Sequence, residues 1–184
     1  MISPFGRSGL SLVGLLSLGL AGCQGSIGGW RRATSDAIPL AAEQRREPAL
    51  SGNGRLLASI IETNGRSSVL LQEQPSGRRL PLRHLRGHQP HGSPSLSWNG
   101  RYLALLLQQG GQRIAAIEDR LNGQLLRLPG PTGSSIEALS LAPDGQTLAL
   151  QLVQAGQQRV QLFDLSGLLE PDRPGAQRIS NPAP

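Results

Sequence analysis

The chain has 184 residues and a formal net charge of +6, from 18 basic residues, all of them arginine, against 12 acidic ones. This length is enough for one domain, and the single cysteine, Cys23, excludes an intrachain disulfide. The arginines are scattered apart from three adjacent pairs, and few aromatic residues accompany them. Nucleic-acid binding needs clustered basic residues and a recognisable reading element, so we expect no nucleic-acid partner.

Residues 1–22 have the organisation of a signal peptide. Arg7 supplies a short positive region, and residues 10–20 form an apolar run rich in Leu, Val and Gly. A membrane-spanning helix needs about 20 apolar residues, so this run is too short to span a bilayer but fits the apolar core of a signal peptide.

The motif that ends this segment, Leu20-Ala21-Gly22-Cys23, resembles the lipobox of bacterial lipoproteins. The resemblance implies that the Cys23 thiol receives a diacylglyceryl group, that a signal peptidase cuts before Cys23, and that acyl chains such as palmitate anchor the mature protein. The alternative is an ordinary secretory leader with a chance cysteine. In lipoproteins an Asp after the cysteine usually signals inner-membrane retention, so Gln24 is permissive for the outer membrane. We expect a protein anchored to the cell membrane or the outer membrane and facing the periplasm.

Residues 23–47 are predicted to comprise the lipidated cysteine and a flexible tether, because they are Gly-, Ser- and Arg-rich at first and show no sustained period. An alternative is that the Ala-Ile-Pro-Leu stretch at 37–40 adds a strand to the domain. The domain itself is predicted over residues 48–180, followed by a tail at 181–184.

Three copies of one unit of about 45 residues make up this domain, and the repetition determines the predicted fold. Three sets of glycines recur in register: Gly54, Gly100 and Gly145; Gly65, Gly111 and Gly156, each 11 residues later; and Gly77, Gly123 and Gly167, which lie 23, 23 and 22 residues after the first set.

The first set marks hairpin turns, because Asn-Gly and Asp-Gly dipeptides adopt positive φ at low strain. The turn dipeptides are Asn53-Gly54, Asn99-Gly100 and Asp144-Gly145. Short apolar strands are predicted after each glycine, at 56–58, 102–104 and 147–149, at 69–71, 114–117 and 160–163, and at 80–82 and 125–128. Gly or Pro interrupts every window long enough for a helical repeat. We therefore predict an all-β domain of three propeller-like blades, each with about four antiparallel strands.

The units resemble the Trp-Asp repeat propellers and, more closely, the TolB-type propeller of the bacterial cell envelope. The segment 142–145, Ala-Pro-Asp-Gly, matches the Ser-Pro-Asp-Gly phrase that precedes a short apolar strand in that family. Phe163-Asp164 stands where the repeat has its Trp-Asp pair, and Gly87-His88 matches its Gly-His element. The resemblance covers about residues 48–168 and implies a propeller that binds other molecules. It implies a peptidoglycan-associated lipoprotein as the class of partner.

Propellers close with 4–8 blades, whereas three are counted here. The tether and the tail can contribute a partial blade, two chains can join as a homodimer into a six-bladed ring, or the blades can form an open arc. An open arc leaves sheet edges and apolar faces for a partner to cover.

Candidate metal ligands are confined to His84, His88 and His91. Three imidazoles within eight residues could bind zinc or copper. However, Gly87 and Pro90 indicate an irregular loop, and His88 already has a structural role as the repeat's Gly-His. We therefore expect no metal and no cofactor, and retain the three histidines as the candidates if a metal binds.

No pattern of an enzyme stands out. The sequence contains no Gly-x-Ser-x-Gly, phosphate loop or dinucleotide motif. Glu118 and Asp119 are expected to be a solvated pair at a strand end, Asp144 a turn residue, and Asp164 a hydrogen-bond acceptor in its blade. We predict a non-enzymatic protein-binding or scaffolding module with an envelope protein as partner. The alternatives are a propeller-based hydrolase or lactonase with an unrecognised site, or a remnant that has lost its partner.

Overall fold

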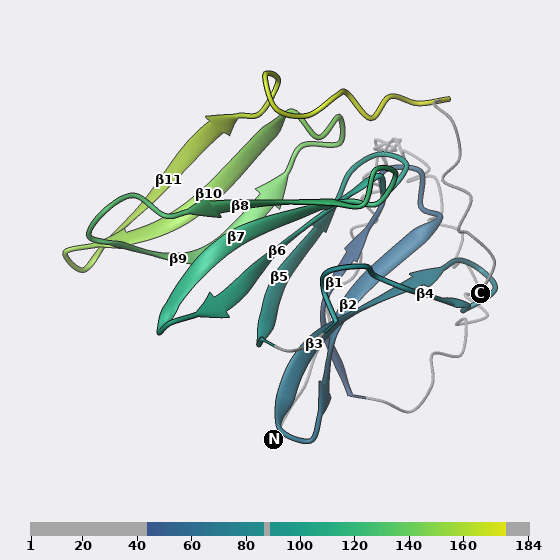
Figure 1. The fold of residues 1–184 in the computed structure, drawn as a ribbon, viewed down its shortest axis with the longest axis horizontal. Helices are drawn as coiled ribbons and strands as arrows, with labels where there is room; N and C mark the ends of the chain where they lie inside the picture. The colour runs from purple at the N-terminus through teal and green to yellow at the C-terminus, as the bar shows by residue number, and fades with distance from the viewer. Residues whose placement is uncertain (1–43, 87–88, 176–184) are drawn as a thin grey trace, which may run out of the picture. The chain divides into compact units, whose positions relative to one another are not determined.

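The computed structural model describes residues 44–86 and 89–175, and within them the regular structure consists of eleven strands. They form three antiparallel sheets, which we call blades 1, 2 and 3 (Figure 1). Blade 1 contains β1 (Arg45–Leu50), β2 (Leu56–Thr63), β3 (Arg66–Glu73) and β4 (Arg79–Leu80). Blade 2 contains β5 (His91–Leu96), β6 (Tyr102–Gln109), β7 (Gln112–Asp119) and β8 (Gln124–Pro129). Blade 3 contains β9 (Ser134–Leu141), β10 (Thr147–Gln154) and β11 (Gln157–Asp164).

The predicted all-β fold with three propeller-like blades is confirmed, and the strands of each blade follow one another in space as in sequence. No helix capable of crossing a membrane occurs in the part of the chain that the structure describes. The predicted signal peptide, the lipobox with Cys23 and the stretch at 37–40 lie outside the described residues. β1 begins at Arg45, so the sheet starts within the segment predicted as tether.

Blade 3 has three strands within the described residues, whereas blades 1 and 2 have four each. In blades 1 and 2, Gly77 and Gly123 adopt φ of 69° and 68° in the turns that lead to β4 and β8. Gly167 occupies the corresponding place in the third copy but lacks a positive φ. The chain therefore does not turn back along β11. Leu165 enters the core instead, with 2% of its surface exposed.

The hydrophobic core lies on both faces of blade 2. Successive side chains of a strand point to opposite faces of its sheet. Leu103 and Leu105 of β6 accordingly join a cluster with β2 and β3 of blade 1, whereas Tyr102 and Leu106 join a cluster with β9 and β10 of blade 3. This two-sided burial explains why residues 102–107 form a continuous apolar run instead of an alternating one.

The turns between the first and second strands of each blade pack against the neighbouring blade. Gly54, Gly100 and Gly145 have φ of 69°, 69° and 79°. A Cβ at Gly100 would collide with Cδ1 of Leu56 from blade 1, whereas a Cβ at Gly54 would meet nothing within 4 Å. Gly100 therefore provides both a left-handed backbone and a close approach between blades, while Gly54 provides the backbone alone.

We predict that Gly100→Ala destabilises the protein more than Gly54→Ala does. Both substitutions place a Cβ in the left-handed region, which costs about 1 kcal/mol, but only Gly100→Ala also forces Leu56 to move, which adds about 2 kcal/mol. Urea unfolding monitored by circular dichroism measures the difference. Equal losses of unfolding free energy in the two variants would contradict the packing of blade 1 on this turn.

Candidate functional site

The first strand of every blade is irregular at one point. Register shifts interrupt the pairing of β1 between Arg46 and Ala49, of β5 between Gly92 and Ser95, and of β9 opposite Gln151 and Leu152. A β-bulge re-aims side chains and is common next to functional sites. The recurrence of a shift in all three first strands points to the surface on which these strands meet.

Two of the three bulges contain residues in an unfavourable backbone conformation. Glu47 has φ of 52° and Ser93 has φ of 50°, and neither is glycine. Such conformations cost of order 1–3 kcal/mol and persist where the surrounding structure holds them. Here hydrogen bonds between blades hold them. The Ser93 N–H donates to the Glu47 carboxylate, and Ser93 Oγ accepts the Leu139 N–H at 3.0 Å. Each blade therefore fixes the bulge of the next.

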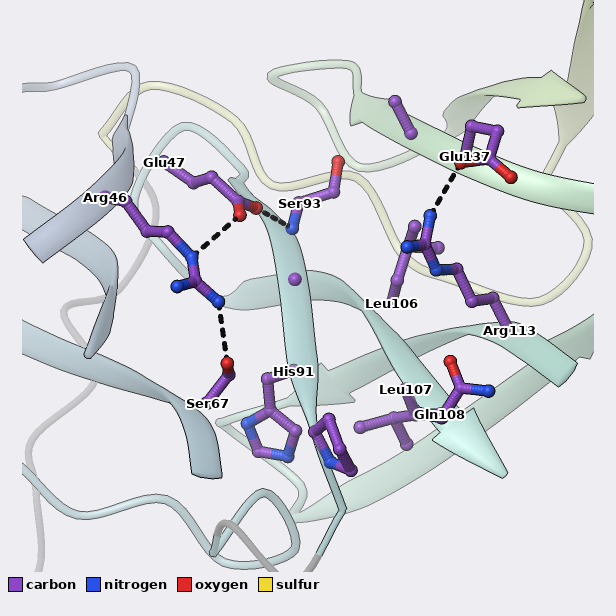
Figure 2. A pocket seen from close by; sticks show the side chains of 13 residues that line it. Arg46, Glu47, Ser67, His91, Ser93, Leu106, Leu107, Gln108, Arg113 and Glu137 are labelled. Atoms are coloured by element: carbon purple, nitrogen blue, oxygen red, sulfur yellow. Dashed lines mark hydrogen bonds and ion pairs between the residues drawn. The ribbon is translucent and has the colours of Figure 1, made fainter. Parts of the chain in front are cut away.

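A groove of about 520 Å³ lies over these bulges, and we call it the inner-strand groove. Its walls come from β1, β5 and β9, together with parts of β3, β6 and β7. Figure 2 shows Glu47 next to Ser93, with Arg46 beside Glu47 and Arg113 beside Glu137. The groove thus combines cationic, anionic and hydroxyl groups with the apolar side chains of Leu106 and Leu107 deeper in its wall.

The charged groups of the groove are paired but accessible. Arg113 Nη1 lies 2.8 Å from a Glu137 carboxylate oxygen, with 45% and 40% of the two side chains exposed. Arg46 lies 3.4 Å from the Glu47 carboxylate and donates to Ser67 Oγ at 2.6 Å. Exposed ion pairs of this kind contribute about 0–1 kcal/mol. Because these pairs are energetically cheap to open, a ligand with its own carboxylates, amines or peptide groups can replace either member.

His91 lies at the base of the groove, and its side chain is hydrogen-bonded to the backbone of β3. It is 5% exposed, and its Nδ1 accepts the Val69 N–H at 3.0 Å. The N–H groups of Val69 and Glu73 point to the same side of β3, and that of Glu73 donates to the Arg78 carbonyl. The pairing of β3 with β4 ends at Leu71, so β4 offers no acceptor to Val69. The imidazole therefore replaces the missing strand partner. Burial lowers the pKa of His91 to about 4, so the ring is neutral at pH 7.

The other two candidate metal ligands do not join His91. His84 is exposed, and its Nε2 lies 2.7 Å from the Gly123 carbonyl, to which it donates. His88 lies outside the described residues. Over residues 44–86 and 89–175, no three His, Cys, Asp or Glu side chains gather as metal ligands would.

The expectation of a solvated carboxylate pair at Glu118 and Asp119 is wrong, because both are buried, with 1% and 5% exposed. Glu118 accepts the N–H groups of Arg83 and His84 at 3.1 and 3.0 Å, which ties the loop after β4 to β7. Buried carboxylates need such donors. Neither carboxylate reaches the inner-strand groove. Their role in the structure is to fix loops.

Asp119 belongs to a charged cluster that sequence analysis did not identify. Arg101 lies 3.0 Å from Asp119 and 2.9 Å from Glu170, and its guanidinium carbon lies 5.0 Å from the centre of the Tyr102 ring. The Arg101 side chain is 11% exposed. The cluster joins the end of blade 2 to the segment that follows β11. Glu170 and Arg101 are 69 positions apart, so no local pattern could have indicated the contact.

Asp172 extends this connection to the turn of blade 2. It is 2% exposed, and its carboxylate accepts the Ser97 hydroxyl at 2.6 Å and the Asn99 N–H at 2.7 Å. The turn residues of neighbouring blades also contact one another, since Asn53 Nδ2 donates to Asn99 Oδ1 at 3.2 Å. Asp144 Oδ1 accepts the Gln146 N–H at 2.9 Å within its own turn. The predicted turn residues therefore lie together at one end of the blades.

The groove residues Arg46, Glu47, Ser93 and Glu137 were not among the predicted site residues. The segments before the turns, Arg-Glu-Pro-Ala-Leu-Ser at 46–51 and Gly-Ser-Pro-Ser-Leu-Ser at 92–97, repeat at a spacing of 46. Aligning the copies from these segments instead of from the turns would have revealed the first strand of each blade. Both segments have a proline at the bulge, Pro48 and Pro94, and this shared proline is the sequence signal of the irregular pairing.

No family model matches the sequence, and no curated protein matches it. Solved structures do. TolB from Acinetobacter baumannii matches with a TM-score of 0.56 and 19% identity over 69% of this chain and 31% of that chain. A putative TolB from Agrobacterium tumefaciens matches with a TM-score of 0.54 and 17% identity over 67% and 47%. The β-propeller domain of the Trilobed protease from Pyrococcus furiosus matches with a TM-score of 0.54 and 14% identity over 71% and 41%.

The chain has a TolB-like β-propeller fold. It spans less than half the length of each of these three structures. The TolB-like fold is shared with a domain of a protease, and fold alone does not determine function. The chemistry of this TolB-like chain depends on the residues of its own groove.

We predict that stability depends on pH through His91. Its pKa is about 4 when folded and about 6.5 when unfolded. Its contribution to stability is complete above pH 6.5 and falls as the pH drops towards 4, by about 1.4 kcal/mol per unit and about 3 kcal/mol at most.

The measurement is urea unfolding at several pH values between 7 and 4, on wild type, His91→Asn and His84→Asn. Asparagine at position 91 keeps an acceptor for the Val69 N–H but does not titrate. We expect a flatter dependence in His91→Asn and an unchanged one in the exposed control His84→Asn. An unchanged slope in His91→Asn would show that the buried imidazole is not responsible.

Proposed function

We propose that the chain is a membrane-anchored lipoprotein of the periplasm that binds another cell-envelope protein without catalysing a reaction. The observation that carries the proposal is the inner-strand groove, where bulges in three blades direct Glu47, Ser93 and Glu137 to one accessible surface. Such a surface is suited to binding a polypeptide loop or terminus, because its polar groups are held on a rigid scaffold and its exposed ion pairs can be opened at a low cost in free energy.

The groove chemistry favours binding over hydrolysis. Ser93 Oγ is engaged by the Leu139 backbone and His91 Nδ1 by the Val69 N–H, so neither group is available as a nucleophile or a general base. The two carboxylates are each paired with a guanidinium instead of with each other. A hydrolase or lactonase needs an acid–base pair within reach of one substrate atom. The proposed occupant is therefore a peptide segment that carries both carboxylate and amine or amide groups.

A variant pair tests the binding site. We expect Arg113→Glu to abolish recovery of the partner after in-cell cross-linking and mild detergent extraction, because it reverses the charge that faces a ligand carboxylate and repels Glu137. Arg127→Glu is the matched control, an exposed arginine on β8 outside the groove. Recovery of the wild-type protein without any partner, or an equal loss in both variants, would contradict the proposal.

The anchor has its own test at Cys23. Several acyl chains give stable membrane attachment, since each buried CH₂ contributes about 0.8 kcal/mol. We expect radiolabelled palmitate to label the wild-type chain and not Cys23→Ser, and the wild-type chain to sediment with membranes. Absence of label in the wild type would reject the anchor while leaving the groove proposal intact.

A further inference from the structure

The outer edge of blade 3 is a long and regular strand. β11 has no strand beyond it within the described residues, and its pairing with β10 is regular over all eight positions. It contains no proline and no bulge. Exposed edges of this kind are templates for pairing with another chain, which proteins ordinarily prevent with short strands, prolines, bulges or charges.

The other edge strands that the structure describes carry such protection. β4 has two residues and is followed by Pro81, and β8 ends with Pro129. β1 and β5 contain Pro48 and Pro94 and are shifted in register, as is β9. β11 therefore differs from every other described edge in being long, regular and free of proline.

The exposed apolar side chains of β11 share one face of the sheet, and its unpaired peptide groups share one edge. Val160 and Leu162 are 72% and 67% exposed and lie on one face of the sheet, opposite Gln151 and Ala149 of β10. The Leu165 N–H donates to the Gln146 carbonyl, so odd-numbered residues bond to β10. The peptide groups of the even-numbered residues 158, 160 and 162 consequently point away from the sheet.

We propose that β11 pairs antiparallel with β11 of a second copy of this chain across a two-fold axis at Gln161. In such a pair, a residue whose peptide group points outward lies opposite a residue of the copy whose peptide group also points outward. With the axis at Gln161, the numbers of two residues that lie opposite one another add up to 322. Val160 then faces Leu162 of the copy, and Leu162 faces Val160. The two pairs bury four apolar side chains that are exposed in the single chain. Each such cross-strand pair contributes about 0.2–1 kcal/mol.

The flanking residues are complementary in the same register, which favours a second copy over another occupant. Arg159 faces Phe163, where a guanidinium and an aromatic ring attract each other. Gln158 faces Asp164, so no like charges lie opposite one another. The two three-stranded sheets become one sheet of six strands. This edge-to-edge dimer differs from a six-bladed ring, in which blades meet through their faces.

The first measurement is the mass of the full chain, purified in mild detergent, by sedimentation with detergent density matching. We expect a dimer at micromolar concentration for wild type and for Leu168→Lys, and at least tenfold weaker association for Leu162→Lys. Leu168 is a matched control, since it is 63% exposed and lies outside β11. A wild-type monomer, or a dimer that Leu162→Lys leaves intact, would overturn the proposal.

The second measurement tests the register by oxidation of Gln161→Cys in membranes. Gln161 faces its copy in a non-hydrogen-bonded pair with Cα atoms about 4.5 Å apart, within the range of a disulfide. Gln157→Cys, whose copies lie about 26 Å apart at about 3.3 Å per residue, is the control. We expect a covalent dimer from Gln161→Cys alone, with wild type reporting any contribution of Cys23. Cross-linking at Gln157→Cys, at neither site, or to a different protein would contradict the pairing.

Discussion

Burial of both faces of blade 2 is the constraint on which the rest of the structure depends. β6 and β7 supply apolar side chains to blade 1 on one face and to blade 3 on the other. A single four-stranded sheet would expose one of those faces to water, and burial of apolar surface is the main favourable contribution to folding. Within residues 44–86 and 89–175 neither outer blade has this two-sided support, so each depends on blade 2 for its own core.

The polar contacts between blades give this stack its precision. Face-to-face apolar packing is not directional, whereas the contacts of Glu47 with Ser93 and of Ser93 with Leu139 repeat at a spacing of 46 residues and align neighbouring first strands. The segment after β11 adds a second alignment through Asp172 and the turn of blade 2. Together these contacts hold strained bulges at the groove, which links the stacking of the blades to the candidate binding surface.

Much of the fold could be predicted from the sequence because it is repeated. The turns require a left-handed backbone conformation, which glycine adopts, and the glycines therefore recur in the sequence at a fixed spacing. The apolar patterns also distinguish the blades. Residues 102–107 of β6 form a continuous apolar run, because both faces of blade 2 are covered. Buried side chains alternate along residues 147–154 of β10, because one face of blade 3 is uncovered within the described residues. The three-stranded form of blade 3 within the described residues could not be predicted, because Gly167 is a glycine in the corresponding position that adopts a different conformation.

The candidate site was less predictable, for a physical reason. Glu118 and Asp119 looked like solvent-exposed charges, and only long-range contacts with the loop after β4 and with Arg101 show why they are buried. The positive φ values of Glu47 and Ser93 are held by hydrogen bonds between blades, which join residues 46 positions apart. His91 belongs to a loop that suggested metal binding, yet its role is set by an unpaired N–H on another blade.

The most direct test of this account is hydrogen–deuterium exchange of the protein under native conditions, followed by mass spectrometry. If two-sided burial of blade 2 supports the structure, the amides of β6 and β7 exchange last, at rates governed by global unfolding. The amides of the short β4 and of β1 then exchange earlier. Exchange of β6 and β7 as fast as that of β1 and β4 would contradict the central role of blade 2.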